Sequence, residues 1–331
     1  MIVVIGSMNL DRTARLERAP EAGETLAIDS MAVAPGGKGG NVAAAAARLG
    51  AQVAMLARVG RDADGAYLRR ALEEAGVDVA GVEAVDEVAT GTAWIWLEAS
   101  GENRIGIFAG ANRTLTPDAL AVAAAGPVAP FAPDRLVVLN LEIPPATIES
   151  AIGRAHRAGA RVLLNLSPVG GLPPSLLCGG DLLVVNGREA AALARRAAPG
   201  DLGAAARMAA ALRAEGPGTV VVTLGAQGAA AADPHGTIEV AGIPVRAVDT
   251  TGAGDAFLGA LAAALDAGIG LNEALGVAAA TGAFTATRPG AQSAQPSARD
   301  LTAFARANGL RLPPLGGDRA GGGAAPRGRE G

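Results

Sequence analysis

Short runs of β-branched and aliphatic residues alternate with longer alanine-rich segments along most of this 331-residue chain. Because the short runs are apolar throughout, they predict strands buried on both faces, as in a parallel sheet covered by helices. The pattern therefore predicts an α/β fold with a central, mostly parallel sheet flanked by helices. The predicted strands are 2–6, 53–60, 136–142, 161–167, 181–186 and 219–225. The predicted helices are 40–49, 64–75, 146–158, 188–198, 202–215, 255–267, 271–286 and 298–307.

Two segments break this alternation and predict a smaller, separate sheet. Residues 92–112 have the pattern of two strands joined by the turn SGEN, and they contain both tryptophans, Trp94 and Trp96. Residues 24–34 also have the composition of a strand. We expect these segments to form a β-sheet lid, the alternative being an antiparallel edge of the main sheet. The predicted main domain covers 1–11, 35–91 and 113–312, the lid covers 12–34 and 92–112, and a tail covers 313–331.

Composition and charge exclude several classes of protein. A net charge of −4 and only 2% aromatic residues give neither the basic surface nor the stacking platforms of a nucleic-acid-binding protein. Cys178 is the only cysteine, which excludes an internal disulfide and a thiolate zinc cluster. The two histidines, His156 and His235, lie far apart in the sequence, which argues against a histidine-rich metal site.

The opening residues do not predict a secretory signal. The opening MIVVIGS lacks the basic start and long apolar core of a secretory signal, and no apolar stretch reaches membrane-spanning length. We therefore expect a cytoplasmic protein that does not enter a membrane. The glycine-rich residues 313–331 cannot bury enough apolar surface to offset the entropy of ordering, so we expect them to be disordered.

The stretch DTTGAGDAF, residues 249–257, places two glycines and an aspartate at the start of a predicted helix. Glycines there allow several N–H groups to point at one place, where the helix dipole also favours an anion. This arrangement predicts an anion site with the Asp255 carboxylate beside it. A glycine-rich turn in which Asp255 serves as an N-cap or first-turn acid is the structural alternative.

Three other stretches carry polar residues in positions that favour binding. PGGKGGN, residues 35–41, surrounds a lysine with glycines that permit close backbone approach, although it matches neither a Walker motif nor a dinucleotide fingerprint. GSMNLD, residues 6–11, follows the first strand, where asparagine and aspartate are also ordinary turn residues. In NGRE, Asn186 and Glu189 have the spacing of a helix capping box, which favours a structural role.

In combination these motifs resemble those of the ribokinase-like family of carbohydrate kinases. The chain carries, in order, GSMNLD, PGGKGGN, AGAN, NLE, NGRE, TLGAQG and DTTGAGDAF, within about residues 2–310. The family has a large α/β domain and a small β-sheet lid, which agrees with the organisation predicted above. The resemblance implies ATP-dependent phosphorylation of a sugar, with D-ribose as the expected acceptor and D-ribose 5-phosphate as the product.

The resemblance also implies the roles of individual residues. Asp255 matches the catalytic base that takes a proton from the sugar hydroxyl, and the N–H groups of Gly252, Ala253 and Gly254 match the anion hole. Phosphoryl transfer mainly requires alignment and charge stabilisation, which a carboxylate beside backbone donors provides. The implied sugar-binding residues are Asn9, Asp11, Gly37, Lys38, Asn41, Glu142 and Asp255. The implied ATP-binding residues are Asn186, Thr223, Leu224, Gly225, Ala226, Gln227, Gly228 and Gly254.

Two metal ions are implied by the same resemblance. Glu189 matches a residue linked indirectly to the magnesium ion that accompanies ATP. A potassium site, formed mostly by backbone atoms, is implied at Asp249, Thr251, Arg288, Gly290 and Ser293. The chain departs from the family pattern in two places. Residues 277–282 lack the histidine expected near adenine, and the serine expected as the last potassium ligand is displaced to Ser293 or Ser297.

The sequence leaves open which molecule accepts the phosphoryl group and whether the chain forms an oligomer. A nucleoside, fructose or a ketodeoxy acid are alternative substrates for the same chemistry, and a sugar sensor without catalysis is a more distant alternative. The intact GAGD sequence argues against the sensor, because binding alone needs no base. A small lid sheet with an apolar face predicts a homodimer formed through the lid.

Overall fold

The computed structural model describes residues 1–100, 102–167, 176 and 179–315. Most of the predicted tail, from residue 316 on, lies outside the described residues, and so does Cys178. Within the described part of the chain, no helix is both long and apolar enough to span a membrane.

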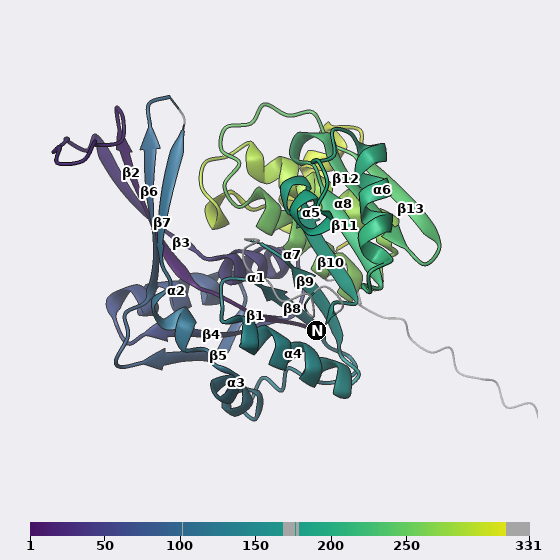
Figure 1. The fold of residues 1–331 in the computed structure, drawn as a ribbon, viewed down its shortest axis with the longest axis horizontal. Coiled ribbons are helices and arrows are strands. Elements are labelled where there is room, and N and C mark those ends of the chain that lie inside the picture. Colours follow the sequence, from purple (N-terminus) through teal and green to yellow (C-terminus); the bar gives the residue numbers. More distant parts are fainter. Residues whose placement is uncertain (101, 168–175, 177–178, 316–331) are drawn as a thin grey trace, which may run out of the picture.

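A nine-stranded sheet forms the centre of the main domain, with the strand order β13-β12-β11-β10-β9-β8-β1-β4-β5 in the described chain (Figure 1). Neighbouring strands from β5 to β11 are parallel, and β12 and β13 are added as antiparallel strands at one edge. The strands are β1 (Ile2–Ile5), β4 (Val53–Gly60), β5 (Asp78–Val85), β8 (Leu136–Asn140), β9 (Arg161–Asn165), β10 (Leu182–Asn186), β11 (Thr219–Thr223), β12 (Gly228–Asp233) and β13 (Gly236–Ala241).

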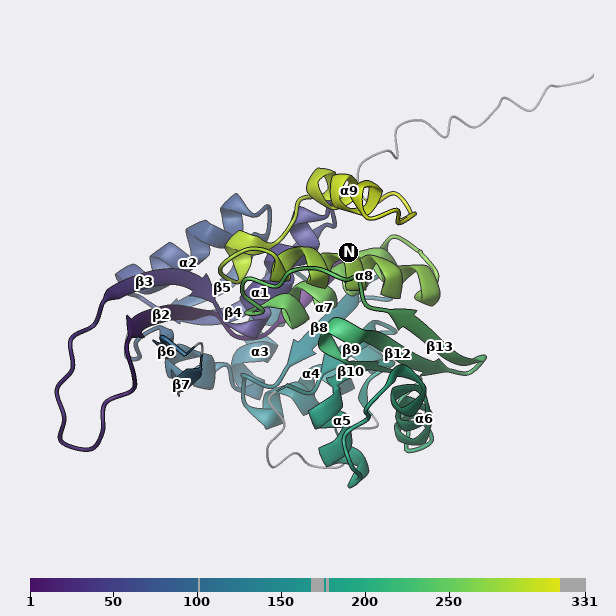
Figure 2. The ribbon, with the colours of Figure 1, turned by 90° about the horizontal axis from the view of Figure 1, so that it is seen from above.

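Helices cover both faces of this sheet, which explains why its strands are apolar throughout (Figure 2). Along β1, Ile2 and Val4 join the core under one helical layer, whereas Val3 and Ile5 join the core under the other. The first layer consists of α1 (Lys38–Arg48), α2 (Ala63–Glu74), α7 (Ala253–Asp266), α8 (Leu271–Ala286) and α9 (Ala298–Ala307). The second consists of α3 (Pro117–Ala124), α4 (Pro145–Arg157), α5 (Gly187–Ala194) and α6 (Leu202–Arg213).

The predicted fold class is confirmed, and every predicted strand and helix of the main domain is present with small shifts at its ends. The sequence pattern did not reveal β5, β12, β13 or α3. Strand β12 is nearly all alanine, a residue that favours helices, but its residues are buried between β11 and β13. Tertiary burial therefore overrides local propensity there.

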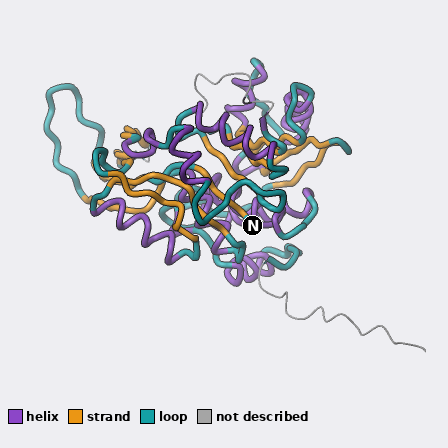
Figure 3. Tube along the Cα trace, turned by 90° about the horizontal axis from the view of Figure 1, so that it is seen from below, coloured by secondary structure: helices purple, strands orange, loops and turns teal. Residues whose placement is uncertain are grey.

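A four-stranded sheet projects from the main domain, in the order β3-β2-β6-β7 (Figure 1). The hairpin predicted within 92–112 is confirmed as β6 (Gly91–Glu98) and β7 (Asn103–Phe108). The strand predicted over 24–34 is wrong in its first part, because β3 (Ser30–Gly36) begins only at Ser30. The connection that precedes β3 extends away from the body of the protein (Figure 3).

Strand β2 (Asn9–Leu16) pairs with β3 in an antiparallel and with β6 in a parallel arrangement. A turn was the structural alternative for Asn9 and Asp11, and this alternative is wrong, because both belong to β2. The chain therefore passes from the main sheet into the small sheet within a few residues of β1. An ion pair at 2.7 Å between Arg12 and Asp64 connects β2 to helix α2.

Candidate active site

The two central strands β1 and β8 mark the point where the chain reverses its direction of travel across the sheet. From β1 the order runs through β4 to β5, and from β8 it runs the other way through β9 to β11. Ligands of open α/β sheets bind beyond the carboxyl ends of the strands at such a point. Ser7 follows β1 and Glu142 follows β8, and the Ser7 hydroxyl donates a hydrogen bond of 2.5 Å to Glu142 Oε2.

The glycines of the PGGKGGN stretch fit helix α1 against this sheet edge. Gly37 has a φ of +81°, and a Cβ there would lie 2.6 Å from the backbone nitrogen of Asn9. A Cβ at Gly39 would lie 2.7 Å from the backbone nitrogen of Ser7. The close approach of these two glycines is therefore to neighbouring protein backbone, and it places the α1 N-terminus beside Glu142. The Lys38 N–H accordingly donates to Glu142 Oε2 at 3.0 Å.

Asp255 lies in the first turn of α7, but its carboxylate contacts helix α1. The N-cap of α7 is Gly252, with a φ of +71°, so the alternative in which Asp255 is the N-cap is wrong. Asn41 Nδ2 donates to Asp255 Oδ2 at 2.8 Å, and Lys38 Nζ lies 3.7 Å from Oδ1. The structure thus brings Lys38, Asn41 and Asp255 together from distant parts of the sequence.

The carboxylates of Asp11, Glu142 and Asp255 repel one another in this part of the site. Burial, together with the charges of Glu142 and Asp255, raises the pKa of Asp11 to about 7. Conversely, the negative charge of Asp255 raises the pKa of Lys38 against the opposing effect of burial, with Glu142 and Glu189 adding to the rise. The arrangement favours a cation or a set of hydroxyl donors between these carboxylates.

Asn112 is a site residue that was not selected from the sequence. Its side chain is 2% exposed and bridges the start of β2, with Nδ2 donating to Asn9 Oδ1 at 2.8 Å and to the Met8 carbonyl at 3.1 Å. The Met8 N–H donates back to Asn112 Oδ1 at 3.0 Å. Asn112 ends the AGAN motif that follows the hairpin, so the signal was present in the sequence.

A cavity of about 460 Å³ lies between the small sheet and the main domain. Among the predicted sugar-binding residues, Asn9 and Glu142 line it, and Ile107 of β7 contributes a wall from the small sheet. The remaining lining residues are Ala109, Asn112, Arg113, Leu141, Ile143, Pro144 and Pro145. Its polar groups come from Asn9, Asn112, Arg113 and Glu142, whereas the predicted sugar-binding residues Asp11, Gly37, Lys38, Asn41 and Asp255 do not line it.

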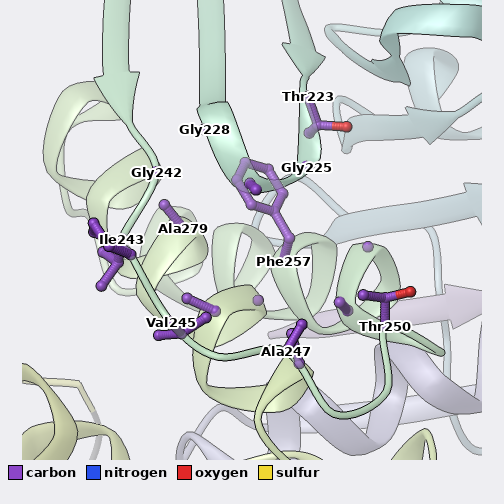
Figure 4. Close-up of a pocket in the computed structure, with 17 residues that line it drawn as sticks. Thr223, Gly225, Gly228, Gly242, Ile243, Val245, Ala247, Thr250, Phe257 and Ala279 are labelled. Carbon is purple, nitrogen blue, oxygen red and sulfur yellow. The ribbon is translucent and has the colours of Figure 1, made fainter.

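A second cavity, of about 370 Å³, lies beside the N-terminus of α7 (Figure 4). It brings together two stretches predicted to bind the nucleotide, since Thr223, Gly225, Ala226 and Gly228 line it together with Gly254. Leu224, Gln227 and Asn186 do not line it, although Asn186 pairs with Thr223 in the sheet. The other lining residues are Gly242, Ile243, Pro244, Val245, Ala247, Thr250, Ala253, Phe257, Ala279, Gly282, Ala283 and Ala286.

Most of the residues missed in this second cavity are small or apolar. In Figure 4, Ile243, Val245 and Ala247 follow one another along the segment that borders it, with the Phe257 ring directed toward Gly225. Ala279 and Gly282 lie in the 277–282 segment, which lacks the expected histidine. Such residues gave no sequence signal because they contribute only shape and apolar surface.

The residues predicted to form the anion hole lie at the N-terminus of α7. Among the described residues, no carbonyl or side chain accepts from the N–H groups of Gly252 and Gly254, whereas the Ala253 N–H donates to the Thr250 carbonyl at 3.2 Å. A Cβ at Gly254 would meet no atom within 4 Å, so this glycine faces open space. Free N–H groups at a helix N-terminus can receive an anion.

The Asn186–Glu189 pair forms the predicted capping box at the start of α5, which is confirmed. Asn186 Oδ1 accepts from the Glu189 N–H at 2.9 Å, and Glu189 Oε2 accepts from the Asn186 N–H at 2.8 Å. Glu189 is 8% exposed.

The residues predicted to bind potassium form a loop organised by Asp249. Its carboxylate accepts from the Thr251 N–H at 2.9 Å and the Gly290 N–H at 2.8 Å. Burial opposes ionisation here, but these hydrogen bonds hold the pKa of Asp249 below its ordinary value. Within the described residues, no group of three or more histidine, cysteine, aspartate and glutamate side chains is placed to hold a metal ion.

The other residues predicted to bind potassium have different surroundings. The Arg288 guanidinium lies over the Phe284 ring at 3.7 Å, so its side chain is directed toward α8. A Cβ at Gly290 would lie 2.5 Å from Ser293 Oγ, which places Ser293 next to the Asp249 loop. Ser297 instead caps helix α9, with its hydroxyl accepting from the Asp300 N–H.

Known proteins resemble the chain over most of its length. Residues 1–298 match the pfkB family of carbohydrate kinases. The chain is 38% identical over 305 residues to the ribokinase of Schizosaccharomyces pombe, covering 89% of this chain and 95% of that protein. It is 35% identical over 312 residues to the deoxyribokinase of Salmonella typhimurium, covering 93% and 99%.

A solved structure leads to the same assignment. The structure of Arabidopsis thaliana ribokinase complexed with ribose and ATP superimposes with a TM-score of 0.82 at 30% identity, covering 92% of this chain and 97% of that one. Family and fold agree with the site: Asp255 follows Gly254, which lines the cavity beside α7, and contacts Lys38, whose N–H binds Glu142 of the other cavity. The chain is an ATP-dependent sugar kinase and belongs to the pfkB family of carbohydrate kinases.

Proposed function

We propose that this kinase transfers the γ-phosphoryl group of ATP to D-ribose, giving D-ribose 5-phosphate and ADP. One observation carries the proposal: the first turn of α7 lines one cavity and, through Asp255, contacts residues beside the other. Ala253 and Gly254 line the cavity beside the predicted nucleotide loop. The next residue, Asp255, directs its carboxylate to Lys38 and Asn41 on the acceptor side. The ribokinases among the relatives support ribose as the acceptor.

In this proposal Asp255 acts as the general base. Its Oδ2 is held by Asn41, and Oδ1 is the oxygen that takes the proton from the primary hydroxyl of ribose. The hydroxyl oxygen then attacks the γ-phosphorus, and the bond to the β-phosphate oxygen breaks as ADP leaves. The N–H groups of Gly252 and Gly254 stabilise the charge on the transferred group, joined by Ala253 when its bond to Thr250 opens.

The proposed ribose contacts follow from which atoms are already engaged. Glu142 Oε2 accepts from the Ser7 hydroxyl and the Lys38 N–H, which leaves Oε1 for a sugar hydroxyl. Asp11 accepts from a second hydroxyl, and the charge of Lys38 balances the carboxylates. Asn9 and Asn41 complete the polar lining, and Gly37 supplies backbone.

Magnesium fits the site as an ion carried by the phosphates of ATP. Glu189 Oε2 is engaged in the capping box, so only its second oxygen is available, which suits an ion that retains most of its water ligands. We propose that Glu189 contacts this ion through water. The ion would supply charge neutralisation of the β- and γ-phosphates.

Potassium fits the loop that Asp249 organises. The carboxylate is occupied by the N–H groups of Thr251 and Gly290, so the surrounding carbonyls, with Ser293 Oγ nearby, are the ligands that suit a monovalent cation. We propose that potassium bound there, at the backbone of Thr251, Arg288 and Gly290, steadies the loop leading to Gly252. Comparison of turnover in potassium and tetramethylammonium chloride tests this assignment.

We also propose that the kinase forms a homodimer through the small sheet. This sheet exposes large apolar side chains, with Met31 and Phe108 at 59% and 52% exposure. Val33 and Trp94 share the face of these two residues, whereas the exposed Ile105 and Ile107 lie on the opposite face, with Asn9 and Asp11. Apolar surface of this kind is normally covered by a partner. Light scattering should give about twice the mass of the chain, and Met31→Glu should shift it toward the monomer; a monomeric wild type removes the proposal.

The acceptor is tested by sugar-dependent ADP release from Mg-ATP with ribose, 2-deoxyribose, fructose and adenosine in parallel. The deoxyribokinase relative makes 2-deoxyribose the specific competitor. A kcat/KM for ribose at least about tenfold above the others supports the proposal, since one lost hydroxyl contact costs about 1.4 kcal/mol or more. Preference for another acceptor rejects ribose and keeps the mechanism. Binding of ribose without ADP release indicates a sensor.

A further inference from the structure

The side chain of Asn41 connects the Asp255 carboxylate to a second buried amide, that of Gln292. Asn41 Nδ2 donates to Asp255 Oδ2 at 2.8 Å, and Gln292 Nε2 donates to Asn41 Oδ1 at 3.1 Å. The exposed fractions of Asn41 and Gln292 are 5% and 4%, so water does not compete for these bonds. A buried chain of three side chains therefore ends at Asp255.

The direction of these bonds fixes which end of Asn41 faces the carboxylate. A carboxamide has a donor end and an acceptor end of nearly the same shape, and only its partners distinguish the two orientations. If Asn41 were reversed, its oxygen would face Asp255 Oδ2, and two acceptors would oppose each other. Gln292 opposes this reversal because it presents an N–H donor to Asn41 Oδ1.

The backbone around this chain is held by close contacts that leave little freedom. A Cβ at Gly40 would lie 3.3 Å from Gln292 Nε2, and one at Gly252 would lie 2.8 Å from the Ala291 Cβ. A Cβ at Gly259 would lie 2.6 Å from the Ala45 Cβ, so α7 also approaches α1 closely. Helix α1, helix α7 and the segment with Gln292 thus form one tightly fitted unit.

Gln295 holds the same asparagine in a different way. Its Nε2 donates to the backbone carbonyl of Asn41 at 2.9 Å, and its side chain is as buried as that of Gln292. This bond fixes the backbone of α1 and leaves the orientation of the Asn41 carboxamide untouched. Gln295 therefore contributes to the backbone structure of α1, whereas Gln292 contributes to the orientation of the Asn41 side chain.

We propose that Gln292 is a positioning residue of this kinase, which acts through Asn41 to orient Asp255. The proposal rests on the assignment of Asp255 as the base. With Oδ2 held by Asn41, Oδ1 stays directed to the acceptor side, where Lys38 Nζ lies 3.7 Å away. A carboxylate that rotates out of this position loses its alignment with the hydroxyl, and misplacement by about 1 Å costs up to about 10²-fold in rate.

The test compares Gln292→Met with Gln295→Met, two changes that remove one amide donor each from equally buried sites. We expect Gln292→Met to lower kcat by about 10- to 100-fold, with the KM for ATP changed by less than about threefold. Gln295→Met also removes the buried, unpaired Gln295 Oε1, so it should lower the melting temperature less, and it should lower kcat by less than about threefold. Equal losses of kcat in the two variants would overturn the proposal.

Gln292→Glu gives a pH signature that simple loss of stability does not produce. A protonated glutamic acid can still donate to Asn41 Oδ1, whereas an ionised one presents only acceptors and favours reversal of Asn41. We expect kcat relative to that of the wild type to be highest at low pH and to fall as the pH rises. A pH-independent ratio would contradict an orienting role.

A measurement without turnover separates this inference from the proposed function. In the ligand-free protein, the side-chain amide protons of Asn41 can be followed by nuclear magnetic resonance. Gln292→Met should move these signals and speed their exchange with water, whereas Gln295→Met should leave them near their wild-type positions. Unchanged signals in Gln292→Met overturn the positioning role, even if the wild type phosphorylates ribose. If the signals change but no sugar is phosphorylated, only the proposed function fails.

Discussion

The hydroxyl of Ser7 and the carboxylate of Glu142 are joined by a 2.5 Å hydrogen bond across the boundary between β1 and β8. Ser7 is fully buried, and the Gly39 N–H donates to its hydroxyl at 3.4 Å. Ser7 therefore links the end of β1, the start of α1 and Glu142. This bond holds one carboxylate oxygen in place and leaves the other for a ligand.

Replacing Ser7 by alanine should impair acceptor binding more than chemistry. The change removes one hydrogen bond to a charged group, worth about 1.5–3 kcal/mol, and frees Glu142 to rotate. We expect the KM for the sugar to rise about tenfold or more, with the KM for ATP within about twofold of the wild type. Steady-state kinetics with each substrate varied in turn measures this, and a rise confined to the KM for ATP would contradict it.

The raised pKa of Asp11 predicts how stability depends on pH in the ligand-free protein. Because the native state holds a proton up to about pH 7 while the unfolded chain loses it near 3.8, the native state loses stability as the pH rises between these values. Above about pH 7 the loss is complete. Asp11→Asn has no carboxyl at this position and does not show this loss. Its stability relative to that of the wild type should therefore be higher at pH 8 than at pH 4.

Urea unfolding at both pH values measures this difference. The rise of the Asp11 pKa to about 7 corresponds to at most about 4 kcal/mol, from about 1.4 kcal/mol for each pKa unit, and water access to the carboxyl reduces this value. A variant whose stability relative to the wild type is the same at pH 4 and pH 8 would show that Asp11 is ionised normally. The same variant should also bind ribose more weakly, since a charged acceptor is lost.

Gly37→Ala should strongly destabilise the fold. Its φ of +81° disfavours a side chain, and the added Cβ would lie 2.6 Å from the Asn9 nitrogen. Gly76 offers a matched control, because its φ is +89° but no atom lies within 4 Å of the added Cβ. We expect a loss of about 1 kcal/mol for Gly76→Ala and at least about 2 kcal/mol more for Gly37→Ala. Chemical denaturation gives both values, and equal losses would refute the close approach of α1.

Gly254→Ala should lower the activity of the kinase without lowering its stability. No atom lies within 4 Å of the added methyl group, and alanine favours a helix, so the fold should be as stable as the wild type or slightly more so. The methyl group would nevertheless enter the cavity beside the proposed anion hole. We expect kcat to fall by at least about 10²-fold. Gly276→Ala, another open helical glycine, is the control and should retain activity.

The sequence predicted the main domain well because each buried strand carries its own apolar signal. It failed for β12, where alanine burial depends on neighbours that are distant in sequence, and for β2, where Asn9 and Asp11 have the composition of a turn. The motifs located the residues of the site, but not the contacts among them. That Asn41 binds Asp255 follows from the fit of α1 against α7, which no local pattern encodes.

Residues that support others were the hardest to identify. Ser7 and Asn112 lie within the GSMNLD and AGAN motifs but acquire meaning only through Glu142 and Asn9, their partners across the fold. Most residues that line the cavity beside α7 are alanine, glycine, proline or valine, which are common throughout the chain. Apolar shape therefore becomes visible only once the chain is folded.

The most direct test of the account is the single-turnover rate of ribose phosphorylation by Asp255→Asn, measured beside the equilibrium binding of ATP. Asparagine keeps the shape of the side chain and an oxygen for Asn41 Nδ2, but it cannot take a proton. We predict a rate at least about 10³-fold lower, with ATP affinity within about threefold of the wild type. A rate within about tenfold of the wild type would contradict the role of Asp255 as the base.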